Sequence, residues 1–344
     1  MVNTRHIVLG MLSIGLSTLL AYSASANPSG RKNILILFSK EEFAEVAHID
    51  AFERILQTQL KEEPISVEFH HRYLTGNIDK DYAMLKEAFT TDKRWDVVVT
   101  NTTSATKFAN RYLQNQIPIV FTSLYDPVSS GVIRTMDRPS HLGLTGVAID
   151  HNIRRKTELA MQVARTKFPK RDLNIAFIHT NDPNDLAELE ALRSNFSSQA
   201  NVTLLPLLVE ANYDSDSDVL KDLLNKAINK HAEHIDFLWE ASGLLGRLPN
   251  LTKYLIDTKK IVLVGATQKS LSAGAIMIMQ PHPDAVGRKT ASMVRRVLKG
   301  EKAGKMIPEV PQGMQIGINL KSALKANLVI PFPILKEAGG NILK

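Results

Sequence analysis

Short apolar runs alternate along the chain with longer segments in which apolar residues recur every three or four positions. The run at 33–38 is almost continuously apolar and predicts a strand buried on both faces of a sheet. Apolar residues from Ile49 to Leu60 follow at helical spacing, and Pro64 ends this predicted helix. Further predicted elements are strands at 65–69, 96–99 and 117–121, helices at 82–89 and 104–113, and a short helical piece at 128–135. Strands that alternate with helices in this way predict a parallel, doubly wound sheet.

The same alternation restarts after Gly146 to Ile149. Helices are predicted at about 155–167, 186–196, 219–229, 248–258 and 285–298, and strands at 174–178, 202–208, 235–239, 261–264, 275–279 and 316–320. The chain carries no short repeat and no low-complexity segment. We therefore predict an α/β fold of two lobes, each built on a doubly wound parallel sheet.

Residues 1–26 have the pattern of a secretory signal peptide. A short basic start at Arg5 precedes an apolar run from Ile7 to Leu20, and Ala24-Ser25-Ala26 supplies a small-x-small cleavage site. The apolar run is shorter than the roughly 20 residues that a membrane span needs. We expect a cleaved signal and an exported, periplasmic chain.

Composition narrows the class of protein. The chain of 344 residues is 44% hydrophobic and 22% charged, which is typical of a globular protein and excludes a collagen, a coiled coil or a disordered tail. Its 42 Lys and Arg against 35 Asp and Glu give a net charge of +7, without a basic run interleaved with aromatic residues, so we expect no nucleic acid as partner. Cysteine is absent, which excludes disulfides, thiolate zinc sites, a cysteine nucleophile and a lipid-bearing cysteine.

Catalytic and metal-binding motifs are absent or incomplete. There is no Gly-x-Gly-x-x-Gly after a strand and no Gly-x-Ser-x-Gly elbow. The acidic residues from Asp214 to Asp218 resemble the start of a calcium loop, but Val219 stands where the loop requires glycine. His231 and His234 have no third ligand at suitable spacing. We therefore expect no catalytic residues, no metal and no cofactor.

Polar turns follow six of the predicted strands. In open α/β sheets the carboxyl ends of the strands face the ligand crevice, so hydroxyls, amides and helix N-termini gathered there suit a small polar or anionic group. Such side chains also cap helices everywhere, which leaves a purely structural role open for each single turn. The candidate ligand-binding residues are Ser39, Glu41, Thr102, Thr103, Ser104, Thr122, Tyr125, Asp126, Asn181, Asp182, Glu240, Ser242 and Thr267.

Three segments resemble one family of ABC transporter substrate-binding proteins, whose better-known members bind aromatic amino acids. They are IPIVFTSLYDPVSSG at 117–131, VLKGEK at 297–302 with a linker to Pro311, and GINLKSALKANLVIP at 317–331. The resemblance extends over about 32 to 333. It implies a periplasmic-binding-protein type I-like fold.

The resemblance also implies how the chain is divided. After the signal peptide at 1–26, the N-lobe takes 27–148 and 280–311, and the C-lobe takes 149–279 and 312–344. Crossings near 149, 280 and 312–315 would form a three-stranded hinge. The lobes close around a ligand, and a membrane permease recognises the closed form.

Pocket residues carry over position by position. Thr102, Thr103 and Ser104 match a turn that receives a carboxylate in the family, and Thr122, Tyr125 and Asp126 match its Thr-to-Asp-Pro turn, in which the aspartate also suits a turn device. Asn181 and Asp182 match the second-lobe turn.

Two positions depart from the family pattern. Glu240 to Leu244 replaces a Thr-Asp-Asn type turn, and Gly265 to Lys269 replaces an acidic turn. The usual acid for an α-amino group is therefore missing, with Asp182 or Glu240 as candidate replacements.

These features predict a monomeric periplasmic solute-binding protein that captures a small polar molecule, with an aromatic or other amino acid as candidate, and delivers it to an ABC permease. The alternative is a sensory protein that presents its bound form to a membrane histidine kinase or cyclase. An exported α/β enzyme is a third reading, for which the chain offers no catalytic constellation.

Overall fold

The structure is a computed structural model. It describes residues 31–39, 47–90, 94–113, 115–197, 199, 201–211, 217–231, 234–243, 246, 249–259 and 262–344. The predicted signal peptide at 1–26 and the candidate Glu41 lie outside the described residues. Among the described helices, none has the length and apolar character needed to cross a membrane.

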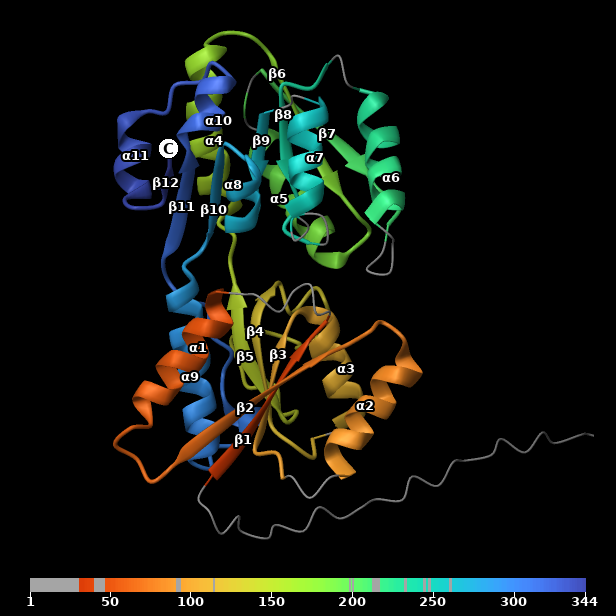
Figure 1. Cartoon of the computed structure of the whole chain (residues 1–344), viewed down its shortest axis with the longest axis vertical. Helices are drawn as coiled ribbons and strands as arrows, with labels where there is room; N and C mark the ends of the chain where they lie inside the picture. The colour runs from red at the N-terminus through yellow and green to blue at the C-terminus, as the bar shows by residue number, and fades with distance from the viewer. Residues whose placement is uncertain are drawn as a thin grey trace, which may run out of the picture.

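Two lobes are stacked along the long axis of the molecule (Figure 1). The first lobe contains a five-stranded parallel sheet in the order β2-β1-β3-β4-β5. Its strands are β1 (Arg31–Phe38), β2 (Ser66–Tyr73), β3 (Val97–Asn101), β4 (Ile119–Tyr125) and β5 (Leu144–Ile149), and its helices are α1 (Ala47–Gln59), α2 (Ile78–Thr90), α3 (Thr103–Leu113) and α9 (Pro283–Leu298).

Strand β1 shows why both faces of this sheet are covered. Ile34, Ile36 and Phe38 belong to the core that includes α1 and α9, whereas Leu35 and Leu37 belong to the core under α2 and α3. All five side chains are 0% exposed. The continuous apolar run of the sequence is thus a central strand whose alternate side chains enter two cores.

The second lobe contains a seven-stranded sheet in the order β12-β11-β10-β9-β8-β6-β7. Its pairs are parallel except for β10 with β11, which is antiparallel. The strands are β6 (Leu173–His179), β7 (Val202–Leu208), β8 (Phe237–Glu240), β9 (Val262–Gly265), β10 (Met277–Pro281), β11 (Met314–Asn319) and β12 (Ile342–Leu343). The helices are α4 (Ile153–Lys167), α5 (Pro183–Ser197), α6 (Ser217–Asn229), α7 (Pro249–Lys259), α8 (Gln268–Ala273), α10 (Leu320–Lys325) and α11 (Phe332–Ala338). Helices again cover both faces, with α4, α5 and α11 on one core and α6 and α7 on the other.

The chain passes between the lobes three times. It leaves the first lobe after β5, returns between β10 and α9, and leaves again after the short 3-10 helix η4 (Ala303–Lys305) (Figure 1). Helix α9 belongs to the first lobe in space because it packs along α1 and against β3, β4 and β5. An isolated bridge between Val147 and Glu309 ties the last crossing to the edge strand β5.

The predicted fold class is confirmed, since two lobes with largely parallel sheets are covered by helices on both faces. One predicted element is wrong: 128–135 forms turns and no helix. Its amides bond within a tight turn, with Ser130 N–H donating to Asp126 O and Gly131 N–H to Val128 O. Gly131 then takes a φ of 73°, a left-handed conformation that stops a right-handed helix.

Candidate functional site

A cleft of about 310 Å³ lies between the lobes and is lined by residues of both. Its size is at the lower end of the range of about 300–1,000 Å³ for small-molecule sites. The first lobe contributes Ala47, His48, Asn101, Thr102, Thr103, Ser123, Tyr125, Pro283 and Val286, the second lobe Asn184, Ser242, Ala266, Thr267, Gln268 and Lys269, and the crossings Ile149, His151, Gln280 and Pro281. Many of these residues follow the carboxyl ends of β3, β4, β6, β8 and β9, where parallel sheets place their ligands.

The start of helix α3 forms one wall of the cleft. Thr102 stands between β3 and α3 with a φ of 100°, an unfavourable conformation for a β-branched residue. Its hydroxyl accepts a hydrogen bond from Ala105 N–H at 3.3 Å and so caps the helix. The first amides of α3, at Thr103 and Ser104, have no partner within the helix, and the positive end of the helix dipole favours an anion here.

Asn101 adds a buried donor beside this helix end. Its side chain is 2% exposed, and its Oδ1 lies 3.1 Å from Nε2 of His48 on α1. The Nδ2 group has no hydrogen-bond partner among the described residues. A buried amide donor without a partner costs free energy, and an acceptor on a ligand in the cleft would satisfy it.

A bulge in β4 decides which hydroxyl reaches the cleft. The pairing of β4 with β5 shifts register between Phe121 and Leu124. Ser123 takes a φ of 58° within the bulge and lines the cleft. Thr122 instead lies 0% exposed inside the first lobe, where its Oγ1 lies 2.8 Å from that of Thr290 on α9. Bulges commonly re-aim a side chain in this way.

Tyr125 ends β4 and lies beside the first crossing. Its ring centroid is 4.8 Å from that of His151 at an angle of 54°. Burial raises the pKa of the phenol, and the negative charges of Glu188, Asp150 and Asp126 raise it further. The hydroxyl therefore keeps its proton at neutral pH and can donate a hydrogen bond into the cleft.

The second lobe faces the cleft with small polar side chains. Ser242 Oγ and Asn184 Oδ1 are buried atoms without a hydrogen-bond partner among the described residues. Thr267 caps α8 by accepting a hydrogen bond from Ser270 N–H at 3.2 Å. Among the described lining residues, Lys269 is the one Lys, Arg, Asp or Glu. The described lining therefore favours an anionic or neutral polar ligand.

Five of the predicted site residues line the cleft: Thr102, Thr103, Tyr125, Ser242 and Thr267. The others that the structure describes do not line it, namely Ser39, Ser104, Thr122, Asp126, Asn181, Asp182 and Glu240. The two aspartates accept hydrogen bonds within their own turns. Asp126 Oδ1 accepts from Ser129 N–H at 2.9 Å within its turn, and Asp182 Oδ1 accepts from Asn184 N–H at 2.8 Å at the start of α5.

Ser39, Ser104 and Asn181 also lie off the lining. Ser39 is 7% exposed directly after β1, whereas Ser104 and Asn181 are exposed. Of these three, Ser104 keeps a route to a ligand through its backbone amide at the start of α3.

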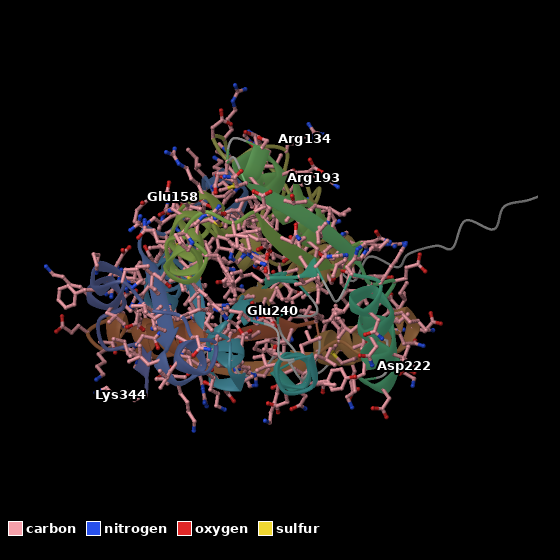
Figure 2. The ribbon with its side chains drawn as sticks, turned by 90° about the horizontal axis from the view of Figure 1, so that it is seen from above. Arg134, Glu158, Arg193, Asp222, Glu240 and Lys344 are labelled. Atoms are coloured by element: carbon pink, nitrogen blue, oxygen red, sulfur yellow. The ribbon has the colours of Figure 1, made fainter. Side chains whose placement is uncertain are left out.

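Glu240 lies in the interior of the second lobe. It is 4% exposed, and in Figure 2 it lies near the centre of the view while the labelled Arg193 and Lys344 lie at the periphery. Its carboxylate accepts hydrogen bonds from Thr252 Oγ1, Ser270 Oγ and Ala266 N–H. Because both oxygens serve neighbouring elements, Glu240 is not positioned to replace the missing acid of the family pattern.

Several lining residues were not among the sequence candidates. They are His48, Asn101, Ser123, Asn184, Gln268 and Lys269 together with the apolar lining. Asn101 and Ser123 stand in the same polar turns as predicted residues, so the turns were visible in the sequence but the orientation of each side chain was not. His48 comes from the start of α1, and only the pairing of β1 with β3 brings it beside Asn101.

The chain is similar to known binding proteins. A curated tyrosine-binding protein of Clostridioides difficile is 24% identical over 240 residues, which are 69% of this chain and 64% of that protein, so the chain spans less than two thirds of its relative. An ABC domain in complex with L-Trp from Streptococcus pneumoniae has a TM-score of 0.74 at 17% identity, covering 91% of this chain and 100% of that structure. A conserved domain protein from Vibrio cholerae has a TM-score of 0.72 at 19% identity, covering 91% and 99%.

The sequence profile described as "ABC transporter substrate binding protein" matches residues 48–342, which is most of the chain. Proteins of this family are substrate-binding proteins and not enzymes, and they work in the periplasm or outside the cell. The match agrees with the two lobes and with the cleft between them. The chain therefore belongs to the family of ABC transporter substrate-binding proteins.

Proposed function

We propose that this protein captures a small ligand with a carboxylate and an apolar body in the cleft between its lobes, and delivers it to an ABC permease. The single observation that carries the proposal is that three residues lining the cleft, one from the first lobe and two from the second, each have a buried polar atom without a described partner: Asn101 Nδ2, Asn184 Oδ1 and Ser242 Oγ. A ligand that satisfies all three links the lobes, and that link favours the closed form.

The two ends of the cleft suit different groups of one molecule. In the first lobe, the start of α3 and Asn101 Nδ2 supply donors for a carboxylate. On the other side, Asn184 Oδ1 is an acceptor and Ser242 Oγ accepts or donates, which suits an ammonium or another N–H donor.

Apolar and aromatic side chains support an apolar ligand body. Ile149, Val286 and the ring of Tyr125 also line the cleft. A tyrosine-binding relative and a neighbour of similar fold in complex with L-Trp point to the same class. An aromatic amino acid is therefore our first candidate. Among the described lining residues there is no Asp or Glu to contact its amino group.

Thermal denaturation of the mature chain with L-tryptophan, L-tyrosine and L-phenylalanine tests this proposal. A ligand at 100 times its dissociation constant should stabilise the folded state by about 2.7 kcal/mol, which is a clear shift in Tm. We expect a shift with at least one of the three. No shift with any of them would reject an aromatic amino acid as the ligand.

Two analogues test the ends of the ligand separately. Tryptamine lacks the carboxylate and should bind about 10- to 100-fold more weakly than L-tryptophan, because charge-assisted hydrogen bonds at α3 are lost. Indole-3-propionate lacks the ammonium and should lose less, since its partners are neutral oxygens. The reverse order would contradict the assignment of the two ends.

Replacing Asn101 with alanine should weaken binding of the same amino acid about tenfold, because one buried donor to the carboxylate is removed. Isothermal titration calorimetry measures the change. Asn229→Ala, an exposed position at the end of α6, is the matched control and should bind like the native chain. Equal affinities for the two variants would place Asn101 outside the binding site.

Delivery to a permease requires its own test. Uptake of the labelled amino acid should fall in cells that lack this chain and recover when the native gene is restored. Recovery with the Asn101→Ala variant should be partial at limiting substrate. Unchanged uptake in a strain whose chain binds the amino acid would favour the sensory alternative.

A further inference from the structure

Two buried carboxylates stand behind the second-lobe wall of the cleft. Asp185 and Glu188 lie three residues apart on α5, so they share one face of the helix, and each is 0% exposed. Neither lines the cleft, and Glu188 was not among the sequence candidates. Ionised carboxylates are costly to bury unless they are hydrogen-bonded, so their partners indicate what they do.

Both carboxylates accept hydrogen bonds from the turn that follows β8. Glu188 Oε2 accepts from Ser242 N–H at 2.9 Å, and Asp185 Oδ1 accepts from Gly243 N–H at 3.0 Å. The other oxygens hold neighbouring groups: Glu188 Oε1 accepts from Trp239 Nε1 at 3.1 Å, and Asp185 Oδ2 accepts from the amide and hydroxyl of Thr180 at 2.8 Å each. Two consecutive amides of one turn are thus fixed to one helix.

Gly243 shows how close this approach is. A Cβ added at Gly243 would stand 2.1 Å from Asp185 Oδ1, so any larger residue would force the Asp185 carboxylate to move. The turn therefore lies directly against α5 because residue 243 carries no side chain. This contact sets the distance between the backbone of the neighbouring Ser242 and helix α5.

Helix α5 also carries Asn184, which with Ser242 lines the second-lobe wall of the cleft. Asn184 precedes Asp185 at the start of α5, and its Oδ1 lacks a described partner, as does Ser242 Oγ. Asp185 is therefore the link between the two groups: it is adjacent to Asn184 along the chain and bonded to the amide next to Ser242. Moving α5 away from the turn would separate the two groups.

We propose that Asp185 and Glu188 are positioning residues for the ligand: through the hydrogen bonds that they accept, they hold the 242–243 turn against α5, so that Ser242 Oγ and Asn184 Oδ1 face one ligand together. This inference rests on the proposed function of the cleft. It assigns no ligand contact to either carboxylate, and it predicts that binding depends on the hydrogen bonds that they accept from the turn.

The charged and titratable groups around the pair set its response to pH. Asp185 faces Glu188 on its own helix and Asp182 before it, and burial together with these charges raises its pKa to about 7. Lys156 on α4 and Tyr125 on β4 interact electrostatically with Glu188. Lys156 Nζ also lies 4.6 Å from the centroid of the Trp239 ring. Burial lowers the pKa of Lys156, and the negative charges of Glu188 and Glu240 act against this lowering.

Two pH effects with opposite signs follow for Asp185. Below about pH 7 the carboxylate takes up a proton and loses acceptor capacity toward Gly243 N–H, so ligand affinity should fall between pH 8 and pH 6. The unliganded protein should change in the other direction. A pKa raised above the unfolded value makes burial of the ionised form unfavourable, so the contribution of Asp185 to stability is lost as the pH rises through about 7.

The first experiment uses no ligand. Amide hydrogen exchange at Ser242 and Gly243 is measured at pH 8 in the native chain, in Asp185→Asn and Glu188→Gln, and in the control Glu190→Gln, which alters an exposed residue of the same helix. We expect exchange about tenfold faster at Gly243 in Asp185→Asn and at Ser242 in Glu188→Gln, with the control unchanged. Native exchange at both amides in both variants would overturn the proposal.

The second experiment measures affinity for L-tryptophan at pH 6 and pH 8. The native chain and Glu190→Gln should bind about tenfold more weakly at pH 6, whereas Asp185→Asn should bind weakly at both values. A variant with native affinity and a native pH profile would overturn the proposal. If the native chain binds none of the aromatic amino acids, the proposed ligand class fails, and the exchange result with the unliganded chain still decides this inference.

A folding defect in Asp185→Asn would not remove the test. Glu188→Gln keeps the shape of the side chain, and its effect on exchange at Ser242 stands by itself. The unliganded native chain should also gain more in Tm between pH 8 and pH 6 than Asp185→Asn does. Equal gains would show that Asp185 does not titrate in this range, which contradicts the proposal.

Discussion

Replacing Gly146 with alanine should destabilise the first lobe by about 3 kcal/mol or more. A Cβ at this position would stand 2.1 Å from the carbonyl oxygen of Phe121 and 2.4 Å from its Cγ. Gly146 pairs with Phe121 between β4 and β5, directly before the bulge that turns Ser123 to the cleft. Relief of the collision requires β5 to move away from β4, and this movement disturbs the ladder and the cleft wall together.

Urea denaturation, followed by circular dichroism, measures the loss for Gly146→Ala. Gly340→Ala is the matched control, because a Cβ there meets no atom within 4 Å and the backbone is not left-handed. The control should keep the native midpoint. Since two lobes can unfold separately, the first-lobe transition is expected to move while the second stays. Equal midpoints for both variants would contradict the close approach of β4 and β5.

Replacing Glu240 with alanine should destabilise the second lobe by about 3–5 kcal/mol. The change leaves donors on Thr252, Ser270 and Ala266 without their acceptor in a buried environment. It also removes one of the two carboxyl groups that act against the lowering of the pKa of Lys156 by burial. The loss is large because these partners come from α7, α8 and the turn after β9, which the carboxylate joins beneath the cleft.

Thermal and urea unfolding compare Glu240→Ala with Glu190→Ala. Glu190 is exposed on α5 and pairs with Arg193 at 2.5 Å, an interaction that contributes less than about 1 kcal/mol. Glu240→Gln should fall between the native chain and Glu240→Ala, because the amide keeps one acceptor oxygen and the shape. Equal stability of the two alanine variants would show that the buried carboxylate does not hold the second lobe together.

Much of the fold was predictable because buried parallel strands leave a strong pattern. The continuous apolar run at 33–38 became a central strand, and the helical spacing that begins at Ile49 became α1. The prediction at 128–135 was wrong because a short apolar spacing cannot reveal that Asp126 organises a turn there. The short helices α8, α10 and α11 were not predicted, since six or seven residues are too few for a period to be recognised.

The candidate site was predicted at the level of turns and not of side chains. The turn after β3 was identified, and Thr102 and Thr103 do line the cleft, yet Asn101 beside them provides the unpartnered donor. In the next turn the bulge in β4 exchanges the roles of Thr122 and Ser123. A shift of one residue along a strand turns a side chain to the opposite face, and sequence spacing does not record it.

The sequence by itself determined the alternation of strands and helices, the two lobes and the resemblance to substrate-binding proteins, because these depend on local periodicity and on contiguous motifs. Only the tertiary structure decided that Glu240 is buried and joins α7, α8 and the turn after β9 by hydrogen bonds. It also decided that Ser123 and Asn101 line the cleft, and that Asp185 and Glu188 bind the amides of the turn at Ser242. The reason is physical. Which atoms of a turn reach a ligand depends on bulges, crossings and contacts between residues more than 50 positions apart, as between Glu188 and Ser242, and such contacts exist only after the lobes have folded.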